Sequence, residues 1–409
     1  MDQTVVIFTE KITNRIEYIF DFIFSDFLGL KYEIVISKNI FDEYNGPKIN
    51  FSNQFLEHEI NFNVDEILLE NDIKTTTNYS TLNEFGKCFY WLSRYEEYIA
   101  EPYLFDKHQR FLGSDLDYSK PIVDLICMEI QKQISIKYSQ LIFKERVFEQ
   151  INTHDVDYAW KYLYHSPKIK IGSIAKKLLK ANFREAQKQV NVWLGKEKDP
   201  YATFDYLRDL ARKYDVKTVF FWLLGDYSTF DKNHDWKNKN QKELINDVAR
   251  WATIGIHPSY QSNHKSDLLQ TEINRLELLT NQSVKKSRQH FIKLNFPQTY
   301  QQLLKSGILE DYTMGFANRI GFRAGTSTPY KWFDLSTNEQ TLLITYPFVA
   351  MDVTLRNYMK LTTEEAIGEL KQLKDTIKSV NGTFITLLHQ SNLDEDWVEW
   401  RKVYESIFE

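Results

Sequence analysis

The feature that most constrains the fold is an alternation of short apolar runs with helical runs, which begins at about residue 145. The apolar runs read as strands; they are VFEQINTHD, VKTVFFWLLG, ATIGIH, KKSRQHFI, LEDYTMG, IGFRAG, LLITYPFV and GTFITLLH. Helical runs such as FDYLRDLARKY and QKELINDVARWA separate several of them. Because parallel strands need a crossover between them, this alternation predicts a parallel sheet or barrel with helices over residues 146–409.

The first part of the chain predicts a smaller mixed α/β domain over residues 1–145. VVIF near the start and YEIVIS at 32–37 read as short strands around a helical ITNRIEYIFDFIF. Further helices are expected at STLNEFGKCFYWLSRYEEYIA and PIVDLICMEIQKQI. The total of 409 residues also predicts two or three domains rather than one.

A lysine-rich segment, residues 161–203, interrupts the first strand-to-helix step of the second domain. It contains KIKIGSIAKKLLKANFREAQKQ, and we predict a helical insertion there. The insertion either caps a substrate site or, as is more common for a run of like charges, presents a solvated face.

Composition disfavours some classes of partner. The net charge of −5 gives no broad attraction to phosphate backbones or anionic lipid, so nucleic acid and membrane surfaces are poor first candidates. Aromatic residues form 15% of the chain, a high share that favours stacking surfaces such as those that bind sugars. Core packing remains the better explanation for most rings individually.

Cysteine usage and the N-terminal sequence fit a cytoplasmic protein. Cys88 and Cys127 lie in no cluster typical of structural zinc or of a disulfide framework. The N-terminus begins with an acidic residue and breaks its apolar runs with charges, unlike a signal peptide. No stretch is long and apolar enough to span a bilayer. We therefore expect a cytoplasmic location and no membrane span.

Polar residues that can carry chemistry fall at the ends of the predicted strands. They are Asp155 and Asp157 in THDVDYAW, His257 in IGIHPSY, Arg288 and His290 in SRQHF, and His389 in ITLLHQSN. Taken singly, an aspartate can cap a helix and a histidine can be a satisfied core residue. The C-terminal ends of parallel barrel strands converge on one face, however, so we expect these residues to meet in space.

These residue types suit hydrolysis by metal-activated water. Of two carboxylates one residue apart, one can bind a divalent metal and the other can act as general base toward the bound water. An imidazole supplies the nitrogen ligand that zinc and similar ions prefer. Another histidine can protonate a departing amine, and an arginine beside a carboxylate keeps that carboxylate ionised. The pattern indicates a hydrolase of an amide or ester.

The first domain contains a polar cluster of its own. Its members are Arg94, Glu96, Glu97, Asp106, His108 and Arg110. The cluster is either a site or a salt-bridged anchor for a loop, and we favour the anchor.

The order of the motifs resembles the polysaccharide deacetylases of carbohydrate esterase family four. THDVD, IGIHPSY, SRQHF with Pro297, EDYTMG and TLLH follow one another over roughly residues 145–395. The chain is especially similar to a bacterial branch in which an N-terminal domain precedes the catalytic domain. WLSRYEEY at 91–98 and a D-x-H-x-R-F segment at 106–111 match that branch, with Gln109 where glycine is commoner.

The resemblance implies a distorted (β/α)7-type barrel that binds a divalent metal, commonly zinc, and removes N-acetyl or O-acetyl groups from a carbohydrate. In this comparison Asp155 matches the catalytic base. Asp157 and His257 match metal ligands.

Three further positions match the motifs of that family. Arg288 matches the arginine that orients the base, with Arg323 in GFRAGTSTPY as a competing candidate. Asp311 matches the aspartate that positions the catalytic histidine. His389 matches that histidine, which protonates the leaving amine.

One position departs from the family pattern. A second metal-binding histidine normally follows the first by four residues, but Gln261 occupies that position here. Glutamine is a weak ligand for zinc, so another group is expected to complete the site. His290 and His264 are the candidates, and we prefer His290 because it lies beside Arg288 at a predicted strand end. The departure also leaves open a non-catalytic protein that binds or assembles surface polysaccharide.

Residues near the motifs are expected to contact the sugar. They are Tyr158, Trp160, Ser259, Tyr260, Tyr312 and Arg323, with a backbone amide near Tyr158 as a candidate donor to the oxyanion. For each ring, core packing is the competing explanation. A hydrolase of a non-sugar amide and a homo-oligomer are also compatible with the sequence, and the first domain could present substrate or mediate dimerisation.

Overall fold

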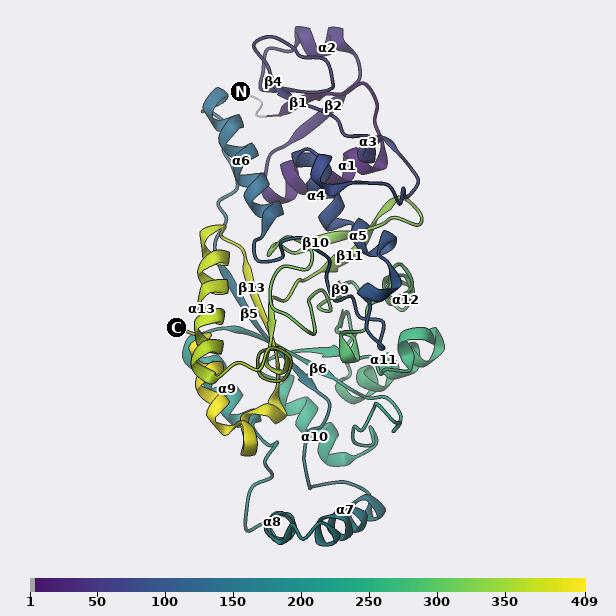
Figure 1. Ribbon diagram of the computed structural model, residues 1–409, viewed down its shortest axis with the longest axis vertical. Coiled ribbons are helices and arrows are strands. Elements are labelled where there is room, and N and C mark those ends of the chain that lie inside the picture. Colours follow the sequence, from purple (N-terminus) through teal and green to yellow (C-terminus); the bar gives the residue numbers. More distant parts are fainter. Residues whose placement is uncertain (1–3) are drawn as a thin grey trace.

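Two separate β-sheets organise the chain in the computed structural model, which describes residues 4–409 (Figure 1). Residues 1–3, the start of the predicted N-terminal domain, lie outside the described residues. Both sheets consist mainly of parallel strands with helices between them, which confirms the predicted α/β class.

The first sheet contains four parallel strands in the order β2-β1-β3-β4. The strands are β1 (Val5–Phe8), β2 (Tyr32–Val35), β3 (Lys48–Phe51) and β4 (Ile60–Phe62). The helices of this part are α1 (Asn14–Phe20) with a π-helical continuation (Asp21–Phe27), α2 (Lys38–Glu43), α3 (Glu66–Leu69), α4 (Glu84–Leu92), α5 (Tyr95–Ile99) and α6 (Ile122–Lys137). Phe20, Phe51 and Phe85 pack against one another in its core, with the rings of Phe51 and Phe85 4.8 Å apart. These buried rings fill a core.

The second sheet contains nine strands in the order β10-β11-β9-β8-β7-β6-β5-β13-β12. All neighbouring pairs are parallel except β10 and β11. The strands are β5 (Glu149–Val156), β6 (Lys217–Trp222), β7 (Thr253–Ile256), β8 (Lys286–Ser287), β9 (Glu310–Asp311), β10 (Tyr330–Asp334), β11 (Glu339–Thr345), β12 (Ala350–Met351) and β13 (Thr383–His389). The register aligns Asp155 with His389 at the C-terminal ends of β5 and β13.

The strand pairing does not close this sheet into a ring. Within residues 4–409, no pairing joins β10 to β12, so the sheet keeps two edges. The predicted barrel is therefore not confirmed. Because these strands are parallel, the C-terminal ends of β5, β6, β7, β8 and β13 all lie at the same end of the sheet. A site built from several strands needs this arrangement.

Helices cover the second sheet, and one helical pair projects from it. The covering helices are α9 (Phe204–Tyr214), α10 (Lys239–Val248), α11 (Ser266–Thr280), α12 (Gln298–Lys305), α13 (Thr363–Ser379) and α14 (Arg401–Ser406). The predicted insertion forms α7 (Pro167–Leu179) and α8 (Phe183–Trp193), which lie at the lower end of the molecule in Figure 1. No helix among the described residues combines the length and apolar character needed to cross a bilayer.

Two predicted strands differ from the structure. IGFRAG forms turns, because Gly321 has a φ of +122° and Gly325 packs against the ring of Trp91. LLITYPFV ends as a strand at Thr345, where it completes an antiparallel hairpin with β10. Strand β10 was not predicted; its residues pack against the first part of the chain.

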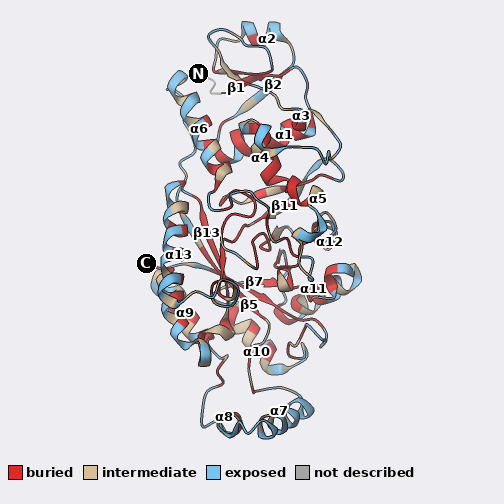
Figure 2. Ribbon diagram, in the orientation of Figure 1, coloured by how far each residue is buried: buried red, intermediate tan, exposed pale blue. Residues whose placement is uncertain are grey.

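A buried polar cluster joins the two parts. Glu97 of α5 accepts hydrogen bonds from Nε and Nη2 of Arg323, at 2.9 and 2.6 Å. It also accepts one from Nε of Arg94 at 2.9 Å. Figure 2 shows buried residues continuing across this junction. The cluster containing Arg94 and Glu97 is thus a structural anchor, as we favoured from the sequence.

Candidate metal centre

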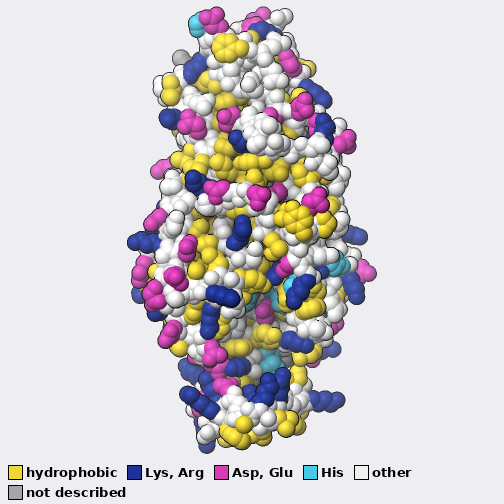
Figure 3. All heavy atoms as spheres, in the orientation of Figure 1, with side chains coloured by type: hydrophobic (Ala, Val, Ile, Leu, Met, Phe, Trp, Pro, Cys, Tyr) yellow, Lys and Arg dark blue, Asp and Glu magenta, His cyan; other side chains and the backbone are white. Residues whose placement is uncertain are grey.

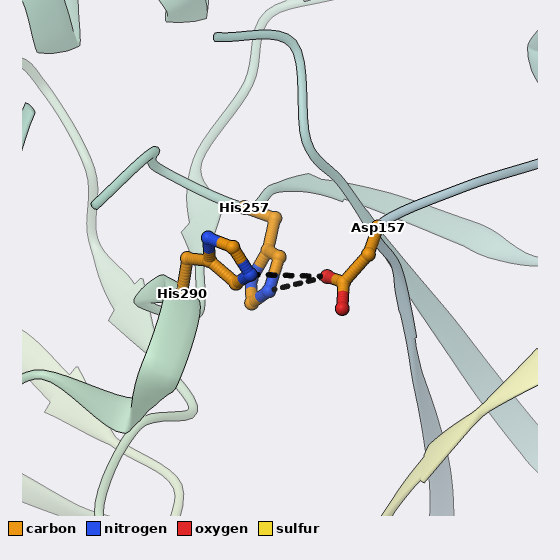
Figure 4. A group of neighbouring side chains, drawn as sticks. All are labelled: Asp157, His257 and His290. Carbon is orange, nitrogen blue, oxygen red and sulfur yellow. Dashed lines mark ion pairs between the residues drawn. The ribbon is translucent and has the colours of Figure 1, made fainter. Parts of the chain in front are cut away.

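Three side chains from different strand ends point at one another (Figure 4). Asp157 follows β5, His257 follows β7, and His290 lies just beyond β8. Asp157 Oδ1 lies 3.3 Å from His257 Nε2 and 3.6 Å from His290 Nε2. One ligand atom from each residue lies within 4.8 Å of the other two.

The hydrogen bonds behind the two imidazoles direct their Nε2 atoms inward. His257 Nδ1 lies 2.6 Å from the backbone oxygen of Arg288, and His290 Nδ1 lies 2.9 Å from Asp231 Oδ1. A carbonyl or carboxylate oxygen can only accept, so each Nδ1 must carry its proton. With Nδ1 engaged in this way, the Nε2 atom of each ring faces Asp157. A hydrogen bond from the ring nitrogen that faces away from the ion is typical of metal-binding histidines.

The donor set fits a divalent cation. Asp157 Oδ1 is buried and accepts no hydrogen bond within the described chain, although it faces two imidazole nitrogens. Two nitrogen donors and one carboxylate oxygen form a ligand set typical of catalytic zinc. Burial alone would raise the pKa of Asp157, but the positive potential of His290, His257 and His389 holds that pKa well below its usual value. The carboxylate is therefore ionised and available as a ligand.

Asp231 is a residue that the sequence reasoning missed. It lies in the loop after β6 and holds His290, while its own Oδ1 accepts a 2.8 Å hydrogen bond from the backbone of Tyr260. Ser228 Oγ donates to the other carboxylate oxygen. An acidic residue in a loop after a predicted strand was a signal available in the sequence, but nothing marked Asp231 among its neighbours.

Asp155 and Arg288 form a buried pair on one side of the three ligand residues. Arg288 Nη1 lies 3.2 Å from Asp155 Oδ1 and donates to Thr153 Oγ1 at 2.6 Å. Its Nε donates to the backbone oxygen of Tyr312. Asp155 Oδ2 lies 3.6 Å from His257 Nε2. The structure thus places Asp155 beside the ligand residues.

Arg323 lies elsewhere, which corrects two expectations. Its guanidinium is occupied by Glu97 and by the backbone oxygen of Gly315, and the side chain is buried. It therefore cannot orient Asp155 and is not available to a substrate.

His389 also lies beside Asp157. Its Nε2 is 4.0 Å from Asp157 Oδ2, and its Nδ1 is 2.9 Å from Asp352 Oδ1. Asp352 Oδ2 also accepts the backbone N–H of His389 at 2.8 Å. Burial lowers the pKa of His389, but the charge of Asp352 and its hydrogen bond outweigh burial and raise that pKa to about 10. The imidazole is therefore a cation at neutral pH.

The prediction that Asp311 positions His389 is wrong. Asp311 accepts hydrogen bonds from the backbone N–H and the hydroxyl of Thr313. The carboxylate that contacts His389 belongs to Asp352, directly after the short strand β12. Asp311 ends β9 and Asp352 follows β12 in the same sheet, so only the order of the strands in space distinguishes the two aspartates.

The structure also separates the candidates for the third position of the group, His290 and His264. Gln261 is exposed, and its side chain makes no hydrogen bond in the described part of the chain. His264 is exposed beside Lys293. His290, the preferred candidate, is the residue that completes the group.

The residues expected to contact sugar fall into two groups. Tyr158 and Tyr260 are half-buried; Tyr158 directly follows Asp157, and the backbone of Tyr260 holds Asp231. The others serve the fold: Trp160 packs against Tyr164 and His234, Tyr312 stacks on Tyr346, and Ser259 is bound by Glu272. A cavity of about 630 Å³ is lined by residues from the loops after β5 and β6, among them Tyr164, Tyr227 and Trp236.

A loop from the first part of the chain reaches the ligand residues. His108 Nδ1 lies 3.2 Å from the hydroxyl of Tyr260, and the His108 ring packs against Phe291 at 5.0 Å. Arg110 contacts the backbone oxygen of Phe291 at 3.5 Å, while Asp106 fixes Arg110. Phe291, which follows His290, has a φ of +62°, a strained value for a residue with a side chain. These contacts hold the strained turn beside His290.

Comparisons with known proteins give a family match to the first part of the chain and remote structural likenesses over about two thirds of the chain. Residues 5–139 match a family described as of unknown function, DUF7033. No curated protein matches the chain. Among solved structures, a presumed polysaccharide deacetylase from Mycobacterium smegmatis is 15% identical with a TM-score of 0.41, over 65% of this chain and 85% of that one.

Two further solved structures show weaker likeness. A polysaccharide deacetylase from Bacillus cereus is 12% identical with a TM-score of 0.30, over 64% of this chain and 87% of that chain. A CE4 family pseudoenzyme from Bacillus anthracis is 12% identical with a TM-score of 0.31, over 64% of this chain and 62% of that chain.

Proposed function

We propose that this protein is a metal-dependent hydrolase that removes acetyl groups from an N-acetylated or O-acetylated carbohydrate. The observation that carries the proposal is the convergence of Asp157, His257 and His290, with the Asp155–Arg288 and His389–Asp352 pairs beside them. The carbohydrate part rests on the order of the sequence motifs. We also propose that the chain divides into two domains at about residue 145, a division with which the two separate sheets are compatible. We further propose that the nine-stranded sheet curves toward a distorted barrel.

Asp157, His257 and His290 would hold the metal, with zinc as our first candidate. A bound divalent ion supplies Lewis acidity, which lowers the pKa of water and polarises a carbonyl group. Asp231 and the Arg288 carbonyl fix the tautomers of the two histidines, so these residues keep the pocket ready for the ion.

Asp155 would act as the general base. It takes one proton from the water whose oxygen attacks the acetyl carbonyl carbon. Arg288 donates a charge-assisted hydrogen bond to Oδ1, which orients the carboxylate and leaves Oδ2 on the side of His257. The backbone N–H of Tyr158 is our candidate donor to the developing oxyanion.

His389 would act as the general acid. As the bond between the acyl carbon and the sugar nitrogen breaks, the imidazolium gives its Nε2 proton to that nitrogen, and acetate and an amino sugar leave. Asp352 accepts from Nδ1 and from the backbone N–H, so it orients the ring and stabilises its charge. For an O-acetyl substrate the same proton goes to the sugar oxygen.

A non-catalytic carbohydrate-binding protein is the second candidate, and Gln261 is the observation that favours it. Such a protein would have lost the usual second histidine and with it turnover. His290 supplies a third donor from another strand end, however, and the base and acid pairs are both complete. We therefore rank hydrolysis first.

Metal content and acetate release test the proposal together. We expect the purified protein to bind close to one equivalent of zinc and to release acetate from N-acetylated chito-oligosaccharides. His290→Gln should weaken zinc binding by about tenfold or more, whereas the matched control His264→Gln, at an exposed histidine, should not. Asp155→Asn should keep the metal and lose at least about a hundredfold in acetate release.

The opposite results separate the alternatives. Acetate release that survives Asp155→Asn would remove our assignment of the base. A protein that binds saccharide without metal and without acetate release would be the non-catalytic one. Release from simple acylated amines but from no acetylated sugar would identify a hydrolase of a non-sugar amide.

A further inference from the structure

A helical hairpin, formed by α7 and α8 with the turn between them, projects from one end of the molecule and leaves apolar side chains in solvent. No residue of α7 is buried, although the helix carries five large aliphatic residues in the sequence PKIKIGSIAKKLL. Two loops join the hairpin to the body of the protein (Figure 1). A helix in a protein gains most of its stability by burying an apolar face, but α8 leaves much of the apolar surface of α7 uncovered.

The exposed apolar side chains lie at helical spacing. Ile171, Leu178 and Leu179 fall on one face of α7, and Ile171 and Leu179 are 70% and 88% exposed. Phe183, the first residue of α8, and Leu194, directly after its last residue, are 66% and 63% exposed. Figure 3 shows apolar side chains gathered at this lower tip of the molecule. We call these five residues the hairpin stripe.

Cationic side chains accompany the hairpin stripe. Residues 166–198 contain nine lysines and arginines and two glutamates, a net charge of +7 in a chain whose total is −5. Within the described part of the chain, the pair between Lys188 and Glu395 is the only ion pair that a cation of this segment forms. Figure 3 shows Lys and Arg side chains on both sides of the apolar tip. The positive charge of the segment is therefore largely uncompensated.

We propose that the hairpin docks the protein on an anionic lipid surface. The hairpin stripe would enter the headgroup region, and the surrounding lysines would lie against lipid phosphates. Exposed Leu, Ile and Phe side chains combined with lysines are the pattern of helices that lie in the interface of a membrane. A nucleic acid would satisfy the cations but leave the aliphatic side chains in water. Pairing of two hairpins would bring two segments of charge +7 together.

Docking at the hairpin would hold the candidate metal centre near the lipid. Pro167, the first residue of α7, follows Asp157 by ten residues, a length of chain that reaches at most about 35 Å. A carbohydrate carried on a membrane lipid is then the substrate class best placed to reach the pocket. This substrate class rests on the proposed deacetylase function, whereas docking itself does not.

Co-sedimentation with vesicles tests docking on the full-length protein. The two probes are vesicles of phosphatidylcholine alone and vesicles of phosphatidylcholine mixed with phosphatidylglycerol. We expect binding to the anionic vesicles and little to the neutral ones. The double variants Ile171→Ser/Leu179→Ser and Lys176→Glu/Lys180→Glu should each weaken binding by about tenfold or more.

Matched controls change side chains of similar exposure elsewhere. Leu342→Ser in β11 and Ile136→Ser in α6 alter two residues that are each 76% exposed, and both should leave vesicle binding unchanged. Because all these positions are exposed, thermal unfolding should show that every variant folds. Neither metal nor acetate is measured, so a protein that fails the deacetylase assay still gives a decisive result here.

Several outcomes would overturn the proposal. The first is absence of binding to anionic vesicles by the wild type, and the second is binding that both hairpin variants retain. A dimer that the hairpin variants dissociate, without vesicle binding, would identify a second copy as the occupant. Binding of duplex DNA that depends on the same lysines, again without vesicle binding, would replace lipid by nucleic acid.

Discussion

At the scale of single residues, Asp352 determines both the orientation and the charge of His389. Because Asp352 raises the pKa of His389 to about 10, Asp352→Asn should lower that pKa and convert the acid to its neutral form at a lower pH. We predict that kcat falls by about a hundredfold and that the alkaline limb of the pH–rate profile moves to lower pH. Zinc content should not change.

The control for this prediction is Asp375→Asn, which removes an exposed carboxylate of α13. It should leave both kcat and the pH–rate profile as they are in the wild type. An alkaline limb that stays in place in Asp352→Asn would show that His389 is not the group that titrates there.

Asp311 has a structural role, which predicts a pH effect on stability. Burial raises its pKa to about 6 from an ordinary value of 3.8. The folded protein therefore holds this proton more tightly than the unfolded chain, so stability is greatest below about pH 4 and falls as pH rises toward 6. Asp311→Asn should remove this loss, which amounts to about 3 kcal/mol.

Urea unfolding of wild type and Asp311→Asn at acid and at neutral pH measures this difference. The free energy of unfolding of the variant should increase relative to that of the wild type as pH rises from about 4 to about 7. A constant difference across that range would contradict the raised pKa. Asp117→Asn, at an exposed site on a loop, controls for general loss of negative charge.

The residues of the candidate site differ in how well the sequence could predict them. Asp155, Asp157, His257 and His389 each lie at or just after the end of a predicted strand, and parallel strands bring such ends together by geometry alone. Asp231 and Asp352 act through those residues and carry no pattern of their own. Asp231 lies inside a loop, and Asp352 follows a strand of two residues. Their roles depend on distances that only the folded chain defines.

At the scale of elements, the loop over residues 106–111 links the first part of the chain to His290. Arg110 contacts the backbone oxygen of Phe291, and Asp106 holds Arg110 in place. We predict that Arg110→Ala frees the strained turn after His290 and weakens zinc binding by about tenfold, as loss of other contacts behind a ligand does. Hydrogen exchange in peptides covering residues 286–293 should become faster, with or without metal.

Lys107→Ala is the matched control, because Lys107 is an exposed cation of the same loop. It should change neither zinc affinity nor hydrogen exchange. If Arg110→Ala behaves like Lys107→Ala in both measurements, the loop is packed against the site without positioning it.

The strands and helices could be predicted from the sequence where apolar residues recur at regular spacing. β5, β6, β7 and β13 are long or flanked by amphipathic helices, and they occur where the apolar runs predict them. The hairpin of β10 and β11 was not found, because its residues are buried against α4 and α1 as well as within their own sheet. Contacts between parts distant in sequence leave no local period to detect.

At the scale of the whole molecule, charge is separated along the chain. The hairpin segment carries +7, which leaves −12 on the rest of a chain whose total is −5. The total charge argued against a membrane partner, but an average over the chain conceals a local concentration of lysines. Surfaces are recognised over distances near the Debye length of about 10 Å, so the local charge governs docking.

The junction between the two parts of the chain depends on Glu97. Its carboxylate lies between Arg94 and Arg323 in a buried cluster, and these arginines outweigh the effect of burial and lower the pKa of Glu97. Glu97→Ala would leave two buried guanidinium groups without their shared partner, which should cost about 3–5 kcal/mol of stability. The exposed pair Lys38–Asp42 supplies the control, because Asp42→Ala should cost less than about 1 kcal/mol.

Because the pKa of Glu97 is lowered, its contribution is complete above the unfolded value of 4.5 and is lost as pH falls below it. The difference in stability between wild type and Glu97→Ala should therefore shrink in acid, whereas the Asp42→Ala difference stays small throughout. Calorimetry at neutral pH should also show whether the two sheets still unfold together once the shared carboxylate is gone. A Glu97→Ala protein as stable as Asp42→Ala would mean that apolar contacts such as Tyr18 with Phe333 hold the junction without the buried charges.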